Sequence, residues 1–176
     1  ECLKDENFSI AAPIDINDNY DYKFNQKGLT DVNFVKGFAM IINKKNMFNQ
    51  FFDEKIFLYL EEIDLCKNVK MNNGRIVIVN SRITHLGGLS HGNRDDLEIE
   101  KSRNWHWMWS KFYFNKKYHG FFQAFIFILP SFFSSILKIL LFTLLLNSKK
   151  RKIYQFRFSG ILNSIIGKNS WYRIKN

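Results

Sequence analysis

The chain has 176 residues, enough for one domain with a hydrophobic core and an additional segment. All 16 acidic residues lie before residue 101, whereas 14 of the 26 lysines and arginines lie in residues 101–176. This asymmetry indicates an anionic partner for residues 101–176, either a membrane surface or nucleic acid. The only cysteines, Cys2 and Cys66, provide neither a disulfide framework nor the spacing of a metal site.

The first fifty residues alternate between apolar segments and polar loops. Residues 8–14 predict a short strand, and residues 15–30, which are rich in Asn and Asp, predict a surface loop. Residues 32–42 are apolar and contain Gly37, which predicts a strand with a bulge or a close backbone approach at the glycine. One or two helical turns are expected within residues 44–50.

Residues 51–67 combine aromatic side chains with an unusual number of acids. The five carboxylates are those of Asp53, Glu54, Glu61, Glu62 and Asp64. Carboxylates among aromatic residues are costly unless they are paired or functional, because burial disfavours their charged form. General-base chemistry is therefore a hypothesis from residue types alone. The last three acids begin a predicted helix, residues 61–72, whose dipole favours negative charge at this end.

The following residues continue the alternation of strands and helices. Residues 75–79 are β-branched and predict a strand, and a glycine-rich segment around His85 comes next. Residues 95–118 predict a long helix that becomes aromatic at Trp105. The pattern as a whole predicts an α/β layered sheet.

The acid-rich stretch has the form Asp-Glu-x-x-Phe-x-Tyr-x-Glu-Glu-x-Asp-Leu-Cys, and Gly74, an apolar strand and His85-Leu-Gly-Gly-Leu-Ser90 follow it. This ordered series resembles the acceptor-side half of family-2 glycosyltransferases, most closely the rhamnosyltransferase-like members that build bacterial surface polysaccharides. The resemblance implies the C-terminal half of a GT-A-like mixed sheet with flanking helices. The family's Asp-x-Asp motif and a glycine-rich phosphate loop are missing from the sequence. We therefore expect a C-terminal fragment that is inactive alone.

The resemblance also implies roles for the acids. In the family, an acceptor hydroxyl attacks the anomeric carbon of a nucleotide-sugar with inversion, and a carboxylate removes the hydroxyl proton. The base aligns with Glu62, where similar sequences carry Asp. Glu61 or Asp64 is an alternative base, and a purely helix-capping role of these acids is another. Asp53 and Glu54 are expected to shape the acceptor loop.

Three further positions each have two interpretations. His85 resembles a histidine near the diphosphate and a divalent metal, Mg²⁺ or Mn²⁺, whose main ligands would come from the missing half; the alternative is a hydrogen-bonded structural histidine. Gly37 resembles the donor–acceptor junction, with a β-bulge as the alternative. Trp105 could stack against a sugar ring, although its helical face favours core packing or a membrane-interface belt. Ser90 and His91 are weaker candidates.

Residues 121–146 form a hydrophobic segment whose only charge is Lys138. As one helix the segment would be about 39 Å long, enough to span a bilayer. Pro130 interrupts it, however, and both flanks are basic, which favours peripheral or monotopic attachment to the cytoplasmic face of the plasma membrane. A true span is the alternative.

The expected organisation is therefore an acceptor-side half of a glycosyltransferase domain (1–118), a hydrophobic helical segment (119–147) and a basic tail (148–176). The partners implied are a nucleotide-sugar, a saccharide or lipid-linked acceptor, and a membrane surface bound by residues 101–176. The alternative function is a non-enzymatic basic module that binds membrane. Nucleic acid is not expected, because no motif supports it and the apolar run indicates lipid.

Overall fold

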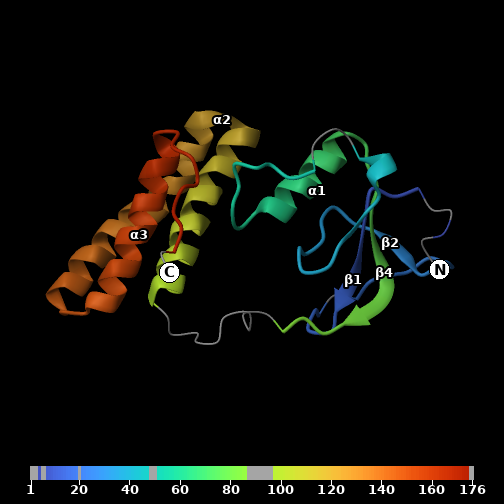
Figure 1. Cartoon of the computed structure of the whole chain (residues 1–176), viewed down its shortest axis with the longest axis horizontal. Helices are drawn as coiled ribbons and strands as arrows, with labels where there is room; N and C mark the ends of the chain where they lie inside the picture. The colour runs from blue at the N-terminus through green and yellow to red at the C-terminus, as the bar shows by residue number, and fades with distance from the viewer. Residues whose placement is uncertain (1–3, 5–6, 20, 48–50, 87–96, 175–176) are drawn as a thin grey trace. The chain divides into compact units, whose positions relative to one another are not determined.

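The structure is a computed structural model, and it describes residues 4, 7–19, 21–47, 51–86 and 97–174 (Figure 1). The chain divides into two compact units, each described by itself. Unit 1 comprises Glu1–Asp53 and Glu61–Ser90, and unit 2 comprises Glu54–Leu60 and His91–Asn176. The expected boundary after Tyr118 falls inside unit 2, because the aromatic helix before it packs with the segments after it.

Unit 1 is built on a four-stranded mixed sheet with the strand order β2-β4-β1-β3. The strands are β1 (Ile10–Asp15), β2 (Leu29–Asp31), β3 (Ile41–Ile42) and β4 (Ile76–Ile83). The two central strands, β1 and β4, run parallel, whereas each edge strand is antiparallel to its neighbour. A mixed sheet combined with helices confirms the predicted α/β class.

Helix α1 (Glu61–Met71) covers one face of this sheet (Figure 1). Alternate β1 residues, such as Ile10 and Ile14, join Leu65 and Val69 of the helix in one buried cluster. This alternation follows the two-residue period of a strand. Each fully buried aliphatic side chain contributes about 1.5–3 kcal/mol to folding. The predicted helix and the strand that follows it are both confirmed, and the strand continues as far as Ile83.

The strand predicted for residues 32–42 is wrong. Of this segment, only Ile41–Ile42 forms a strand, and Val32 adds one backbone hydrogen bond of 3.0 Å to Ile76. Gly37 lies in a turn rather than at a bulge, and the expected alternative, a close approach at the glycine, is found against α1. Four apolar side chains of this segment instead belong to or pack against the cluster beneath α1, with Val35 buried and Val32, Met40 and Ile42 partly buried. The polar loop also ends in strand β2. A short 3₁₀ helix, Lys44–Asn46, provides one turn where one or two were expected, and residues 48–50 of that segment lie outside the described residues.

The described residues of unit 2 contain three helical segments. Helix α2 (Leu97–Leu144) is interrupted at Gly120, whose φ of 82° and ψ of 167° are not helical. We call residues 97–119 the first arm and residues 121–144 the second arm. The second arm folds back along the first, as Figure 1 shows, and Lys111 donates a hydrogen bond of 3.3 Å to Ser131 across the two arms.

Helix α3 (Ser148–Ile165) completes unit 2. The shared core contains side chains from both arms and from α3: Met108, Phe112, Ala124, Ile128 and Ile161. At Gly160 the backbone of α3 approaches the first arm closely, because a Cβ atom there would lie 2.4 Å from the Trp105 carbonyl oxygen. One turn later the Ser164 hydroxyl donates to the Trp109 carbonyl at 2.9 Å. These contacts hold α3 directly against the first arm.

His106 is a titratable side chain of unit 2 with no exposed surface. Its Nε2 lies 2.9 Å from the Tyr172 carbonyl oxygen, and its Nδ1 lies 2.9 Å from the Ser170 hydroxyl. A carbonyl oxygen only accepts, so Nε2 carries the proton and Nδ1 accepts one from Ser170. Burial is the main cause that lowers the pKa of His106 to about 4; the hydrogen bond to the Tyr172 carbonyl opposes this shift, and the charge of Arg173 adds to it.

Acidification is expected to destabilise unit 2 through His106. An unfolded histidine titrates near pH 6.5, so between pH 6.5 and pH 4 the unfolded state binds more protons than the folded state. Stability is therefore complete above pH 6.5 and falls by about 1–3 kcal/mol as the pH drops to 4. Thermal unfolding of the wild type and of His106→Gln across this range tests the prediction. Equal pH dependence in the two proteins would contradict it.

Candidate functional site

The candidate site of unit 1 lies where the two parallel central strands end. Strand β1 ends at Asp15, which pairs with Ile83 at the end of β4, and His85 follows two residues later. In open α/β sheets, ligands bind outside the carboxyl ends of parallel strands. Asp15 and His85 therefore lie at the edge of the sheet where a ligand is expected.

Asp15 is almost completely buried at this edge. Its Oδ1 accepts hydrogen bonds of 3.1 Å from both the backbone and the side-chain nitrogen of Asn17. Its Oδ2 lies 3.9 Å from His85 Nδ1. The backbone bond from Asn17, followed by a backbone bond from His85 and the charge of Lys36, holds the pKa of Asp15 below its usual value although burial opposes this. Asp15 therefore remains a carboxylate.

Lys36 links Asp15 to a second acid. Its ammonium lies 3.7 Å from Asp15 Oδ2 and forms an ion pair with Asp18. The hydrogen bond to Asp18 raises the pKa of Lys36, so this side chain remains protonated. The edge of the sheet thus carries a fixed ammonium group between two carboxylates.

Gly37 and Phe38, which follow Lys36 in the chain, contact two of the predicted site residues, Glu62 and His85. A Cβ atom on Gly37 would lie 3.2 Å from the Cβ of Glu62, so the turn passes directly over the first turn of α1. The ring of Phe38 stacks on the ring of His85 with a centroid separation of 4.6 Å and an interplanar angle of 11°. Three consecutive residues therefore gather Asp15, Glu62 and His85 around one turn, which we call the Lys36–Phe38 turn.

The acid beside Glu62 has an unusual environment. The Oε2 atom of Glu61 is buried and lacks a hydrogen-bond partner within the described part of the chain. Burial raises the pKa of Glu61, and the charge of Glu62 raises it further, whereas a bond from its own backbone nitrogen lowers it. A half-buried carboxyl group with a raised pKa is typical of functional sites. Asp64, the third predicted acid, is buried within the same helix.

The backbone is strained immediately before these acids. Tyr59 and Leu60 have φ values of 67° and 69°, in the left-handed region that non-glycine residues rarely adopt. Each such residue costs about 1 kcal/mol or more.

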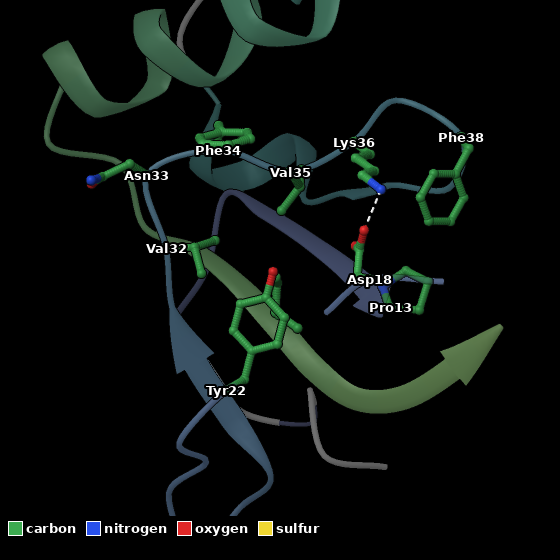
Figure 2. Close-up of a pocket in the computed structure, with 10 residues that line it drawn as sticks. Pro13, Asp18, Tyr22, Val32, Asn33, Phe34, Val35, Lys36 and Phe38 are labelled. Carbon is green, nitrogen blue, oxygen red and sulfur yellow. Dashed lines mark hydrogen bonds and ion pairs between the residues drawn. The ribbon is translucent and has the colours of Figure 1, made fainter. Parts of the chain in front are cut away.

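A pocket of about 320 Å³ opens beside the Lys36–Phe38 turn (Figure 2). The rings of Tyr22, Phe34 and Phe38 contribute to its walls, and the ion pair between Lys36 and Asp18 adds charged groups. Its other lining residues are Pro13, Val32, Asn33, Val35 and Ile78. A mostly apolar cavity with a few polar groups at one side is typical of small-molecule sites.

The remaining predicted residues are not part of this arrangement. Trp105 has no exposed surface and donates a hydrogen bond from Nε1 to Ser159, so the structure favours its packing role over sugar stacking. Asp53 is half-buried in unit 1, and Glu54 is exposed in unit 2. Ser90 and His91 lie outside the described residues.

The described residues do not by themselves form a metal site. Within the ranges given above, no group of three or more His, Cys, Asp and Glu side chains is suitably placed. Asp15 and His85 would supply two ligands at most, and the ammonium of Lys36 already neutralises that position. We therefore derive no step of the chemistry through a metal.

Comparison with known proteins yields no relative. No protein-family model matches the chain, and neither a curated protein nor a solved structure matches it significantly. The functional conclusion therefore depends on the geometry of the site and on the motif series in the sequence.

Asp15, Lys36 and Asp18 are the functional candidates that sequence reasoning missed. A signal for the first was present, since Asp15 is an acid that directly follows the buried strand segment 10–14. Lys36 carried no comparable signal. Its neighbourhood depends on the parallel pairing of β1 with β4 and on the turn that crosses α1.

Proposed function

We propose that unit 1 is the acceptor-side half of an inverting glycosyltransferase. The observation that carries the proposal is the contact of one turn with both Glu62 and His85, two residues selected independently from the motif series. In the proposed reaction, an acceptor hydroxyl oxygen forms a bond to the anomeric carbon of a nucleotide-sugar. The bond from that carbon to the diphosphate oxygen breaks, and the hydroxyl proton passes to a carboxylate of the protein.

Glu62 is the proposed base, and Glu61 is its alternative. Glu62 packs against the turn at Gly37, and it is the acid that the motif series marks as the base. Burial raises the pKa of Glu61, and its Oε2 has no hydrogen-bond partner among the described residues, so this carboxylate is a better proton acceptor than an exposed one. The proposal therefore assigns proton removal to this acid pair and names Glu62 first.

The pocket beside the turn is the proposed site of the acceptor saccharide. Its aromatic rings offer apolar faces to the C–H groups of a sugar, while Lys36 and Asp18 offer a donor and an acceptor to hydroxyl groups. A saccharide or lipid-linked acceptor matches this combination. The nucleotide-sugar, and the main ligands of a divalent metal, would be held by residues outside those described.

Replacing Phe34 with alanine is expected to raise the KM for the acceptor by about tenfold, because one wall of the pocket is lost. The unfolding temperature should stay nearly unchanged, since the Phe34 side chain is 55% exposed and contributes little to the core. Steady-state kinetics with varied acceptor measure the effect. Phe52→Ala is the matched control, because Phe52 is also exposed but does not line the pocket. If the two substitutions change the KM for the acceptor equally, the acceptor does not bind in this pocket.

The proposal includes peripheral or monotopic attachment to the cytoplasmic face of the membrane. Helix α2 is long and apolar enough to cross a membrane by length and composition, and only 11% of its most apolar window is buried. The same observation supports the second candidate function, a non-enzymatic basic module that binds membrane. The two candidates differ in whether the acids of unit 1 perform chemistry.

The test is sugar transfer by the product of the whole reading frame that contains this chain. The purified protein is incubated with a panel of nucleotide-sugars and with lipid-linked saccharides, and nucleoside diphosphate release is measured. The proposal predicts release from at least one donor that depends on the acceptor. Vesicle binding without transfer from any donor would support the binding module instead.

A further inference from the structure

One face of the second arm is apolar and exposed along its whole length. Six residues form this face, which we call the apolar stripe: Phe122, Ile126, Phe133, Leu137, Leu140 and Leu144. At 100° per residue these positions lie within about 60° of one another on the helix. All six are more than half exposed, whereas Ala124, Ile128 and Ser135 on the opposite face are buried. The stripe is about 33 Å long.

The size of this surface indicates a partner. Soluble monomers rarely expose a contiguous apolar patch larger than a few hundred Å². The turn after the second arm extends the patch, because Leu145 and Leu146 are 62% and 89% exposed. A core helix of a soluble protein would instead be mostly buried. The stripe therefore faces either lipid or another protein.

Charge favours a lipid surface. Residues 101–176 contain no acid to repel anionic headgroups. Lysines lie over phenylalanine rings at both ends of the second arm, since Lys116 Nζ is 5.7 Å from the ring centre of Phe121 and Lys150 Nζ is 5.4 Å from that of Phe142. Paired aromatic and basic side chains at the two ends of an apolar helix are typical of the membrane interface.

The packing of α3 argues against a simple span. Lys138 donates a hydrogen bond of 3.1 Å to the Tyr154 hydroxyl, and Phe132 packs on Phe158 with ring centres 5.1 Å apart. The two helices are thus antiparallel neighbours, so a spanning second arm would draw α3 into the bilayer. That helix carries the basic run Lys149-Lys-Arg-Lys152 at its start and Arg157 in its middle, so a span would place the charge of Arg157 near the bilayer centre. Charged residues are unfavourable at the bilayer centre, whereas an in-plane helix keeps them at the headgroups.

We infer that unit 2 is an in-plane membrane anchor for anionic lipid surfaces. The apolar stripe faces the acyl chains, and the basic residues at the start of α3 contact the lipid phosphates. The anchor is independent of the transfer reaction proposed for unit 1, since it involves no residue of that site. Its occupant is lipid rather than a second copy of the chain.

Vesicle co-sedimentation tests the anchor directly. The wild type should bind vesicles of phosphatidylcholine with 30% phosphatidylglycerol at least tenfold more tightly than vesicles of phosphatidylcholine alone. The double substitution Leu137→Ser with Leu140→Ser should weaken binding to the anionic vesicles at least tenfold. Met71→Ser with Leu86→Ser is the matched control, because both residues are 68% exposed in unit 1. Equal loss in the two double variants would overturn the inference.

Two further outcomes separate the anchor from its alternatives. A protease site inserted after Leu146, in the exposed turn between the second arm and α3, should be open to protease in inside-out vesicles, where the cytoplasmic face is outward. Protection of this site would indicate a true span, whether or not α3 returns across the bilayer. Sedimentation equilibrium without lipid tests self-association through the stripe. The inference would be overturned if the wild type formed a stable dimer and bound no vesicles, and if the Leu137 and Leu140 substitutions dissociated that dimer. The stripe would then be the interface with a second copy of the chain.

Discussion

Glu62→Gln is expected to lower the rate of sugar transfer by about 10²–10⁴-fold, the usual contribution of a general base. The amide has nearly the shape of the carboxylate but cannot accept the proton of the attacking hydroxyl. Glu62 is only partly buried at the start of α1, so the unfolding temperature should change little. Nucleoside diphosphate release under saturating donor and acceptor measures the rate, and circular dichroism monitors the fold.

Two companion substitutions sharpen this result. Glu62→Asp should retain much of the activity, because the shorter side chain still accepts a proton. Glu61→Gln tests the neighbouring acid, whose pKa burial raises. Loss of transfer in Glu61→Gln but not in Glu62→Gln would move the base to Glu61. Wild-type rates in both amide variants would exclude this acid pair from the chemistry.

Gly160→Ala is expected to destabilise unit 2 by about 1–3 kcal/mol, the usual cost of adding a methyl group to a filled core. The added Cβ would lie 2.4 Å from the Trp105 carbonyl oxygen, which is backbone and cannot rotate away. The first arm and α3 would have to separate, which would weaken the contact between Ser164 and the Trp109 carbonyl. Thermal unfolding in mild detergent measures the loss.

The control for this substitution lies on the same helix. Gln155 is exposed on α3, so Gln155→Ala leaves the packing against the first arm intact and favours the helix slightly through its propensity. Its unfolding temperature should match that of the wild type. If Gly160→Ala unfolds at the same temperature as Gln155→Ala, the close approach at Trp105 does not contribute to stability.

Local sequence signals were sufficient for the central elements of unit 1. The helix that begins at Glu61 combines acids in its first turn with apolar residues at helical spacing, and it ends before Asn73 and Gly74. Strand β4 begins with consecutive β-branched residues. Such signals depend only on neighbours in the chain, which is why these two elements could be predicted.

Tertiary packing decided the elements that were missed. The apolar pattern of residues 32–42 is compatible with a strand and also with an irregular segment that packs on the sheet. The segment is irregular in the structure, because its side chains pack in the cluster that α1 completes. Gly120 directly precedes a continuous apolar run, and no local signal marks a break in the helix there. The sequence therefore predicted neither the reversal of α2 at Gly120 nor the packing of its two arms with α3. Both outcomes depend on contacts between residues distant in sequence.

The candidate site shows the same division. Glu62, Gly37 and His85 were identified from the motif series, and the structure brings each into contact with the Lys36–Phe38 turn or places it within that turn. Asp15 and Lys36 were missed, because their proximity arises from the parallel pairing of strands that lie far apart in the sequence. Motifs thus identified the residue types, and sheet topology supplied their neighbours.

The measurement that tests the central claim most directly is the anomeric configuration of the transferred sugar. Proton NMR of the product formed by the whole protein from a nucleotide-sugar of known configuration gives this result in one experiment. A single displacement assisted by a carboxylate base predicts the opposite anomeric configuration in the product. Retention of the donor configuration would contradict the role assigned to Glu62 and its neighbour at the Lys36–Phe38 turn.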